Sequence, residues 1–177
     1  MRLLVLSVIG VVLFATHGVS QSPRQHDIQL FADNVFALSE VMLHDVANPP
    51  AASRFYAYAL LAAYDAAYYA EKKLPDLDSK LKSNPAIVPP IPPANLNLAF
   101  CSNYAMLEVG KLIMPSGPML EEKQTKLIDY FRKKRKMTKN DLDKQVAYAK
   151  QIANQVLDYA KKDAYNKLST YKRYSPN

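Results

Sequence analysis

Histidine is the side chain whose ordinary pKa best suits proton transfer and metal binding near neutral pH, and this chain has three. His17 lies in an apolar N-terminal stretch, His26 in a polar segment, and His44 beside Asp45 near the end of an amphipathic segment. Adjacent helical residues point about 100° apart and do not face each other, so His44 and Asp45 are not a ready catalytic dyad. We expect His26 to be solvated and His44 to cap a helix C-terminus.

The remaining chemically active side chains are scattered. Cys101, the single cysteine, lies in an apolar segment, which favours a small buried core residue; a reactive thiol or an intermolecular disulfide is the alternative. No group of His, Cys, Asp and Glu has metal-ligand spacing, and four glycines form no phosphate-binding loop. We therefore predict no catalytic, cofactor-binding or metal-binding residue in this chain.

Positive charge is concentrated in the last third of the sequence. Residues 121–177 hold 15 Lys and Arg against 7 Asp and Glu, whereas residues 1–120 hold 8 against 9. Much of the excess lies in Arg132-Lys133-Lys134-Arg135-Lys136. A patch for nucleic acid or an anionic membrane is one interpretation, but cations at the end of a helix also meet the negative end of its dipole. We favour a solvated helix end and expect no nucleic-acid partner.

The first twenty residues predict export. Met1-Arg2 gives a positive start, residues 3–15 are uncharged and apolar, and Gly18 and Ser20 place small side chains before a cut after Ser20. A retained membrane anchor is the alternative, but it needs roughly 17–25 apolar residues. We therefore expect a signal peptide at residues 1–20, no stable membrane anchor after cleavage, and a periplasmic or extracellular location.

Five later segments carry apolar residues at helical spacing, and none shows the alternation of a strand. Asn48-Pro49-Pro50 separates the first two helices, because Asn caps a helix and proline is tolerated in the first helical turn. Thr138, with Asp141 three residues on, predicts another N-terminal cap. The expected helices cover residues 27–47, 49–73, 94–114, 119–136 and 139–163. Their order predicts a polar connector at 21–26, a helical hairpin at 27–73, a Pro-rich loop at 74–93, a three-helix segment at 94–163 and a tail at 164–177.

Two helices have informative faces. The first places its apolar residues on one side, at Leu30, Phe31, Val35, Leu38, Met42 and Val46. The second is apolar or aromatic around nearly its whole circumference, which predicts a helix buried among others, with its tyrosines filling gaps. An aromatic ligand cage is the alternative for those tyrosines. The fold class predicted is all-α, a bundle of about five helices.

A family resemblance rests mainly on residues 39–58. There Ser39-Glu40-Val41-Met42 and the run from His44 to Tyr58 resemble the N-terminal helical region of exported, Bacteroidetes-type vanadium-dependent haloperoxidase-like proteins of the type 2 phosphatidic acid phosphatase superfamily. The ending from Asp163-Ala164-Tyr165 through Tyr171-Lys172-Arg173-Tyr174 is similar to the point where those proteins pass into a catalytic half. The resemblance implies an all-helical bundle, of which this chain is an incomplete part.

The chemistry that the resemblance implies does not carry over to any residue here. The family binds vanadate or phosphate with a Lys, six residues, then Arg-Pro, with a Pro-Ser-Gly-His, and with a Ser-Arg, five residues, then His. Pro118 follows Pro115-Ser116-Gly117 where the second pattern has histidine, and Leu60 stands where the third pattern, begun by Ser53-Arg54, has histidine. Arg-Pro does not occur in the sequence. A complete relative would bind vanadate or phosphate in a C-terminal half and hydrolyse phosphate esters or oxidise halides.

Two main hypotheses follow. The first is an N-terminal scaffold portion of such an enzyme, inactive alone, with exposed apolar helix faces available for self-association. The second is a stand-alone exported helical binding or structural protein. A third, basic surface binding through residues 132–136, has less support.

Overall fold

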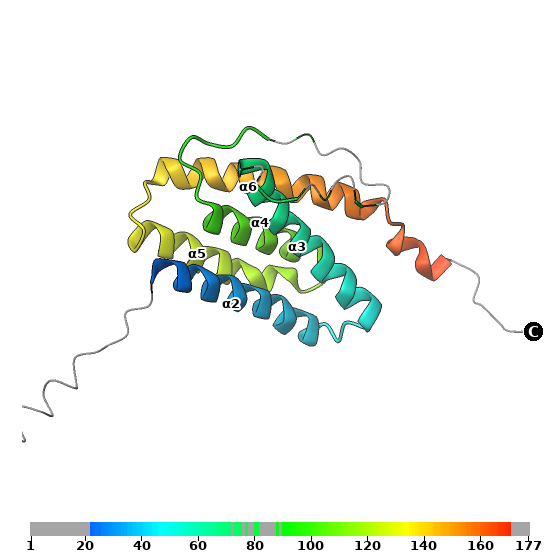
Figure 1. Cartoon of the computed structure of the whole chain (residues 1–177). Helices are drawn as coiled ribbons and strands as arrows, with labels where there is room; N and C mark the ends of the chain where they lie inside the picture. Colours follow the sequence, from blue (N-terminus) through cyan, green and yellow to red (C-terminus); the bar gives the residue numbers. More distant parts are fainter. Residues whose placement is uncertain are drawn as a thin grey trace, which may run out of the picture. The chain divides into compact units, whose positions relative to one another are not determined.

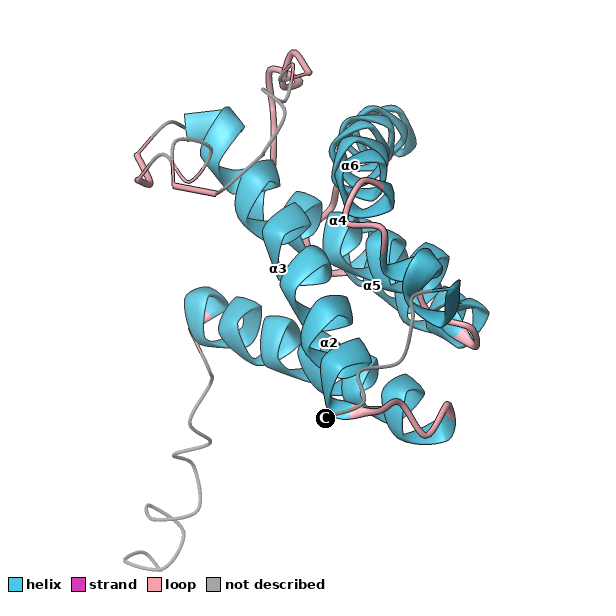
Figure 2. Cartoon of the chain, turned by 90° about the vertical axis from the view of Figure 1, so that its right-hand side faces the viewer, coloured by secondary structure: helices cyan, strands magenta, loops and turns pink. Residues whose placement is uncertain are grey.

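The computed structural model describes residues 22–71, 73–75, 77, 80, 81, 88 and 90–170. Every regular element in these ranges is helical, and Figure 2 shows only helices and loops there. The all-α prediction is confirmed, whereas the expected signal peptide and residues 171–177 lie outside the described part. The chain divides into two compact units, Met1–Leu30 and Phe31–Asn177, and the packing described below is that of the second unit.

The first described helix, α2, runs from Pro23 to His44 and so begins earlier than predicted. The backbone N–H of Ser22 donates to Gln25 Oε1 over 3.1 Å, and the N–H of Gln25 donates to Ser22 Oγ over 3.2 Å. This reciprocal pair is a capping box, with proline at the favoured first helical position. Most of the segment expected to be a polar connector, residues 21–26, is therefore helical.

The turn from α2 to α3 (Pro49–Glu71) contains the asparagine cap that the sequence predicts and a left-handed residue that it does not. Asn48 Oδ1 accepts from the N–H of Ala51 over 3.0 Å, so the predicted asparagine cap is confirmed. At the end of α2, the N–H of Ala47 donates to Met42 O (2.9 Å) and that of Val46 to Leu43 O (3.1 Å). These two bonds form a Schellman turn, which places Val46 at φ 49°, in the left-handed region.

Helix α4 (Leu98–Ile113) lies between α3 and α6 (Lys139–Lys161), and it packs against both (Figure 1). It begins later than the predicted residue 94. Asn97 caps it by accepting from the N–H of Phe100, while Gln145 binds the N–H of Asn97 and the carbonyl of Asn95. The core shared by these helices contains many small side chains, which let helix axes approach closely: Ala59, Ala62, Ala63, Ala66, Ala105, Ala149, Ala153 and Ala160.

The last elements also differ slightly from the predicted bounds. A 3₁₀ turn, η1 (Gly117–Leu120), precedes α5 (Glu121–Lys133), which ends before residue 136. Thr138 caps α6 by accepting from the N–H of Asp141 over 3.1 Å, as predicted. A second 3₁₀ helix, η2 (Tyr165–Thr170), occupies part of the expected tail.

The predicted apolar face of the first helix is correct at its centre and wrong at its end. Leu38 and Met42 are buried, but Val46 is 86% exposed. The reason is the Schellman turn, which takes Val46 off the helix and out of its periodicity. None of the helices in the described ranges is long and apolar enough to cross a membrane.

Candidate functional site

Residues 44–58, called the corner below, contain most of the family resemblance. They also contain the residues whose types come closest to a catalytic arrangement, His44, Asp45 and Arg54. His44 is exposed at the end of α2. Asp45 hydrogen-bonds a distant residue, because its Oδ2 accepts the N–H of Ser116 over 3.1 Å. Hydrogen bonds from Ser116, its hydroxyl first, outweigh the opposing effect of burial and lower the pKa of Asp45. Asp45 is thus an ionised anchor for a distant turn.

That distant turn is the Pro115-Ser116-Gly117 sequence between α4 and η1. A Cβ added at Gly117 would lie 2.0 Å from the carbonyl oxygen of Lys111, so the backbone approaches too closely for any other residue. Pro118, which stands where the family pattern has histidine, is exposed. The turn therefore connects two helices tightly and is held from the corner by Asp45.

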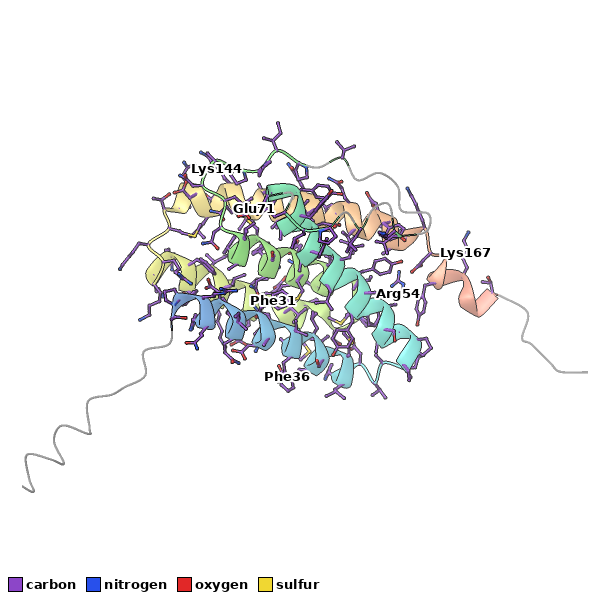
Figure 3. The ribbon with its side chains drawn as sticks, viewed as in Figure 1. Phe31, Phe36, Arg54, Glu71, Lys144 and Lys167 are labelled. Carbon is purple, nitrogen blue, oxygen red and sulfur yellow. The ribbon has the colours of Figure 1, made fainter. Side chains whose placement is uncertain are left out.

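Arg54 makes the second long-range tie of the corner. It lies on α3, facing the segment that follows α6 (Figure 3), where its Nε donates to Asp163 Oδ2 over 2.6 Å. Its Nη2 donates to the carbonyl of Ala160 over 3.0 Å. The guanidinium also lies over the rings of Tyr58 and Tyr165, at 5.2 and 4.8 Å from their centroids. Arg54 therefore caps the C-terminus of α6 and holds the chain that leaves it.

The opposite charges of Arg54 and Asp163 neutralise each other. Burial acts to raise the pKa of Asp163, but hydrogen bonds from Arg54, the Tyr165 N–H and Tyr58 outweigh it and hold that pKa below its usual value. Burial, together with the bond to Asp163, raises the pKa of the Tyr58 hydroxyl to about 12. An ionised Asp163 thus neutralises Arg54, and Tyr58 remains a protonated donor at neutral pH.

Cys101, on α4, is buried against α6, and the predicted small core residue is confirmed. It has no exposed surface, and its thiol faces Gln145 Oε1 at 3.6 Å. Burial raises the pKa of the thiol to about 12. A thiol of this kind carries almost no thiolate at neutral pH, so its chemistry is that of a packing residue.

Two polar pairs inside the bundle were not predicted. Asn34 Nδ2 donates to Asn103 Oδ1 over 2.7 Å, and Gln124 Nε2 donates to Glu108 Oε2 over 2.6 Å. Lys111 also contacts Glu108, at 3.0 Å. Polar residues at inward helical positions were the available signal. These pairs satisfy one another, as buried polar groups must, and they fix how the helices align.

Three side chains of the basic run, residues 132–136, contact residues of α5. Arg132 and Lys133 both contact Asp129, which lies one helical turn earlier on α5, and the guanidinium of Arg135 lies over the Tyr130 ring. In the part of the chain that the structure describes, no three His, Cys, Asp or Glu side chains gather as a metal site would require.

No protein-family model and no curated protein matches this sequence. A solved structure that does match is that of a bacterial vanadium-dependent iodoperoxidase, with a TM-score of 0.72 and 24% sequence identity. The match covers 84% of this chain and 35% of the peroxidase chain. The chain therefore corresponds to about a third of that protein's length, and it has the helical fold of that portion.

Proposed function

We propose that this chain is the N-terminal scaffold portion of a vanadium haloperoxidase-like protein of the type 2 phosphatidic acid phosphatase superfamily. The sequence resemblance at residues 39–58 and the fold likeness to about a third of an iodoperoxidase both support this proposal. In a complete protein of this kind, vanadate or phosphate binds in another part of the chain. The role of the helices described here is to position that part.

One observation supports the proposal most strongly: the charged side chains Asp45 and Arg54 of the corner are engaged in hydrogen bonds to other parts of this chain. An oxyanion cradle needs cationic side chains that converge on an open point and donate to the same ligand. Arg54 instead donates to Asp163 and the Ala160 carbonyl, while Asp45 accepts from Ser116. The corner therefore joins α2 and α3 to the Pro-Ser-Gly turn and to the end of α6. Such a joint aligns helices and leaves oxyanion chemistry to other residues.

The genomic sequence beyond the codon for Asn177 tests this directly. We expect the same frame, or one a single frameshift away, to encode an Arg-Pro after a Lys, a Ser-Gly-His and a Ser-Arg followed by His. A stop codon with no such motifs downstream in any frame would contradict the scaffold proposal.

Export is a separate part of the proposal. A chain secreted from a bacterial host should lose residues 1–20, and intact mass spectrometry of the secreted protein should identify Gln21 as its first residue. Recovery of the full-length chain from the membrane fraction would instead support an uncleaved anchor.

One observation favours the alternative, a stand-alone exported helical protein. Large side chains of the second unit are completely buried in this chain, among them Phe100, Phe131, Leu38 and Ile152. Such a core predicts a single cooperative transition for the mature chain, residues 21–177, in urea. A broad, non-cooperative transition with dye binding at low urea would favour a scaffold that needs the rest of its domain.

A further inference from the structure

The outer face of α2 exposes large apolar side chains. Phe36 is 62% exposed and Leu43 is 76% exposed, and Phe36 points away from the other helices in Figure 3. Phe36, Glu40 and Leu43 are separated by steps of four and three residues, so they share one side of the helix. Phe36 and Leu43 lie two turns apart with Glu40 between them, and large exposed apolar groups that share one side of a helix mark an interaction site.

Residues of η1 and of the beginning of α5 lie beside this side of α2. Lys123 Nζ lies 3.9 Å from Glu40 Oε2, which brings α5 beside this side of α2. Met119, on η1, lies in the sequence between Ser116, which is bonded to Asp45, and Lys123, and it is 51% exposed. We define the α2 face as Phe36, Glu40, Leu43, Met119 and Lys123. It combines three apolar side chains with one acid and one base.

Val46, at the end of α2, adds an independent observation. It is a β-branched residue at φ 49°, a conformation that glycine adopts at no steric cost and that β-branched residues rarely adopt. Its side chain is 86% exposed, so packing within this chain does not offset the strain. A strained, exposed valine three residues after the exposed Leu43 supports a contact made with a surface outside this chain.

We propose that the α2 face binds the α2 face of a second copy of this chain across a two-fold axis. A two-fold interface must be complementary to itself, and this face meets that condition because it carries both charges. Glu40 of each copy would pair with Lys123 of the other, while the apolar side chains pack between them. Within one chain the Glu40–Lys123 contact is long, and the side chains are 51% and 37% exposed, so little stability opposes the exchange of partners. This proposal does not depend on the proposed scaffold function.

Charge exchange tests the pairing. The mature chain, residues 21–177, should form a dimer in sedimentation equilibrium at about neutral pH. Glu40→Lys or Lys123→Glu alone should weaken dimerisation at least about tenfold, because like charges then face each other twice, and the double exchange should restore it. Asp158→Lys is the matched control: Asp158 pairs with Lys161 on α6, outside the α2 face, and the variant should dimerise normally.

Phe36→Ser is the second variant. Because the Phe36 side chain is exposed, this substitution should not disturb folding. It should abolish the dimer while leaving the helical circular dichroism spectrum and the unfolding midpoint of the monomer unchanged. A wild-type chain that stays monomeric or only aggregates overturns the proposal. So does a dimer that survives Phe36→Ser, or one whose charge variants weaken it without recovery in the double exchange.

Discussion

The core between α3, α4 and α6 and the corner at residues 44–58 are stabilised in different ways. The core is a contact of small and aromatic side chains with no exposed surface, such as Ala59, Ala105 and Phe100. The corner is a set of charged hydrogen bonds to residues 71 and 109 positions away, at Ser116 and Asp163. Apolar burial therefore stabilises the bundle, while a few polar contacts fix where the corner lies against the turn at Ser116 and the end of α6.

Truncation in the core should have the largest effect. Phe100 contacts the ring of Phe131 at 5.3 Å between centroids, and neither ring is exposed. Phe100→Ala should lower the free energy of unfolding by about 3–5 kcal/mol, through lost burial and a residual cavity. Urea unfolding followed by circular dichroism measures this. Ile91→Ala is the control, because Ile91 is 93% exposed, and a change of under about 0.5 kcal/mol is expected there. Equal losses for both would remove the distinction between core and surface.

Breaking the Arg54 tie should cost less. Arg54→Met should lower the free energy of unfolding by about 1–2 kcal/mol, because charge-assisted bonds that are only partly buried are lost. Asp163→Asn should lose less after Arg54→Met than in the wild type, a coupling that a double-mutant cycle detects. Asp158→Asn is the matched control, since its partner Lys161 is exposed on the same helix, and it should be nearly neutral. Additive effects of Arg54→Met and Asp163→Asn would show that the pair is not a tie.

Acid should weaken the corner before it weakens the core. Asp45 and Asp163 both have pKa values held below the usual 3.8, so each contributes stability in full above that pH. That contribution is lost as the pH falls below 3.8 through the folded-state values. Urea midpoints measured from about pH 6 to about pH 2.5 should fall less steeply in the Asp45→Asn, Asp163→Asn double variant than in the wild type. Identical slopes would mean that other carboxylates govern the acid response.

The smallest expected effect is a gain. Val46→Gly should raise the free energy of unfolding of the monomer by about 1 kcal/mol, because glycine occupies the left-handed position of a Schellman turn without strain. Val46→Ala keeps the Cβ and is the control, expected to gain less. Differential scanning calorimetry on dilute protein measures both. A loss of stability in Val46→Gly would show that the valine side chain packs against this chain after all.

Local signals in the sequence predicted the elements well, and their failures have local causes. Asn48 and Thr138 cap helices as expected because capping depends on residues three positions apart. The capping box of Ser22 and Gln25 has the same kind of signal, but the polar composition around it favoured a connector. Val46 fits the apolar spacing of α2, yet the turn removes it from the helix.

The candidate site could not be assembled from the sequence in the same way. No spacing rule pairs Arg54 with Asp163 or Asp45 with Ser116, since those contacts exist only once the bundle has formed. The resemblance at residues 39–58 located the corner, but not what its side chains bind. Their engagement in structural ties is information that only the folded chain carries.

Vanadium-51 NMR of orthovanadate, titrated with the mature chain, tests most directly whether the corner is a joint or an oxyanion site. We expect the vanadate signal to stay sharp and unshifted at protein excess, because Arg54 is already neutralised by Asp163. Saturable broadening that disappears in Arg54→Met, while the variant remains folded, would show that the corner is an oxyanion site.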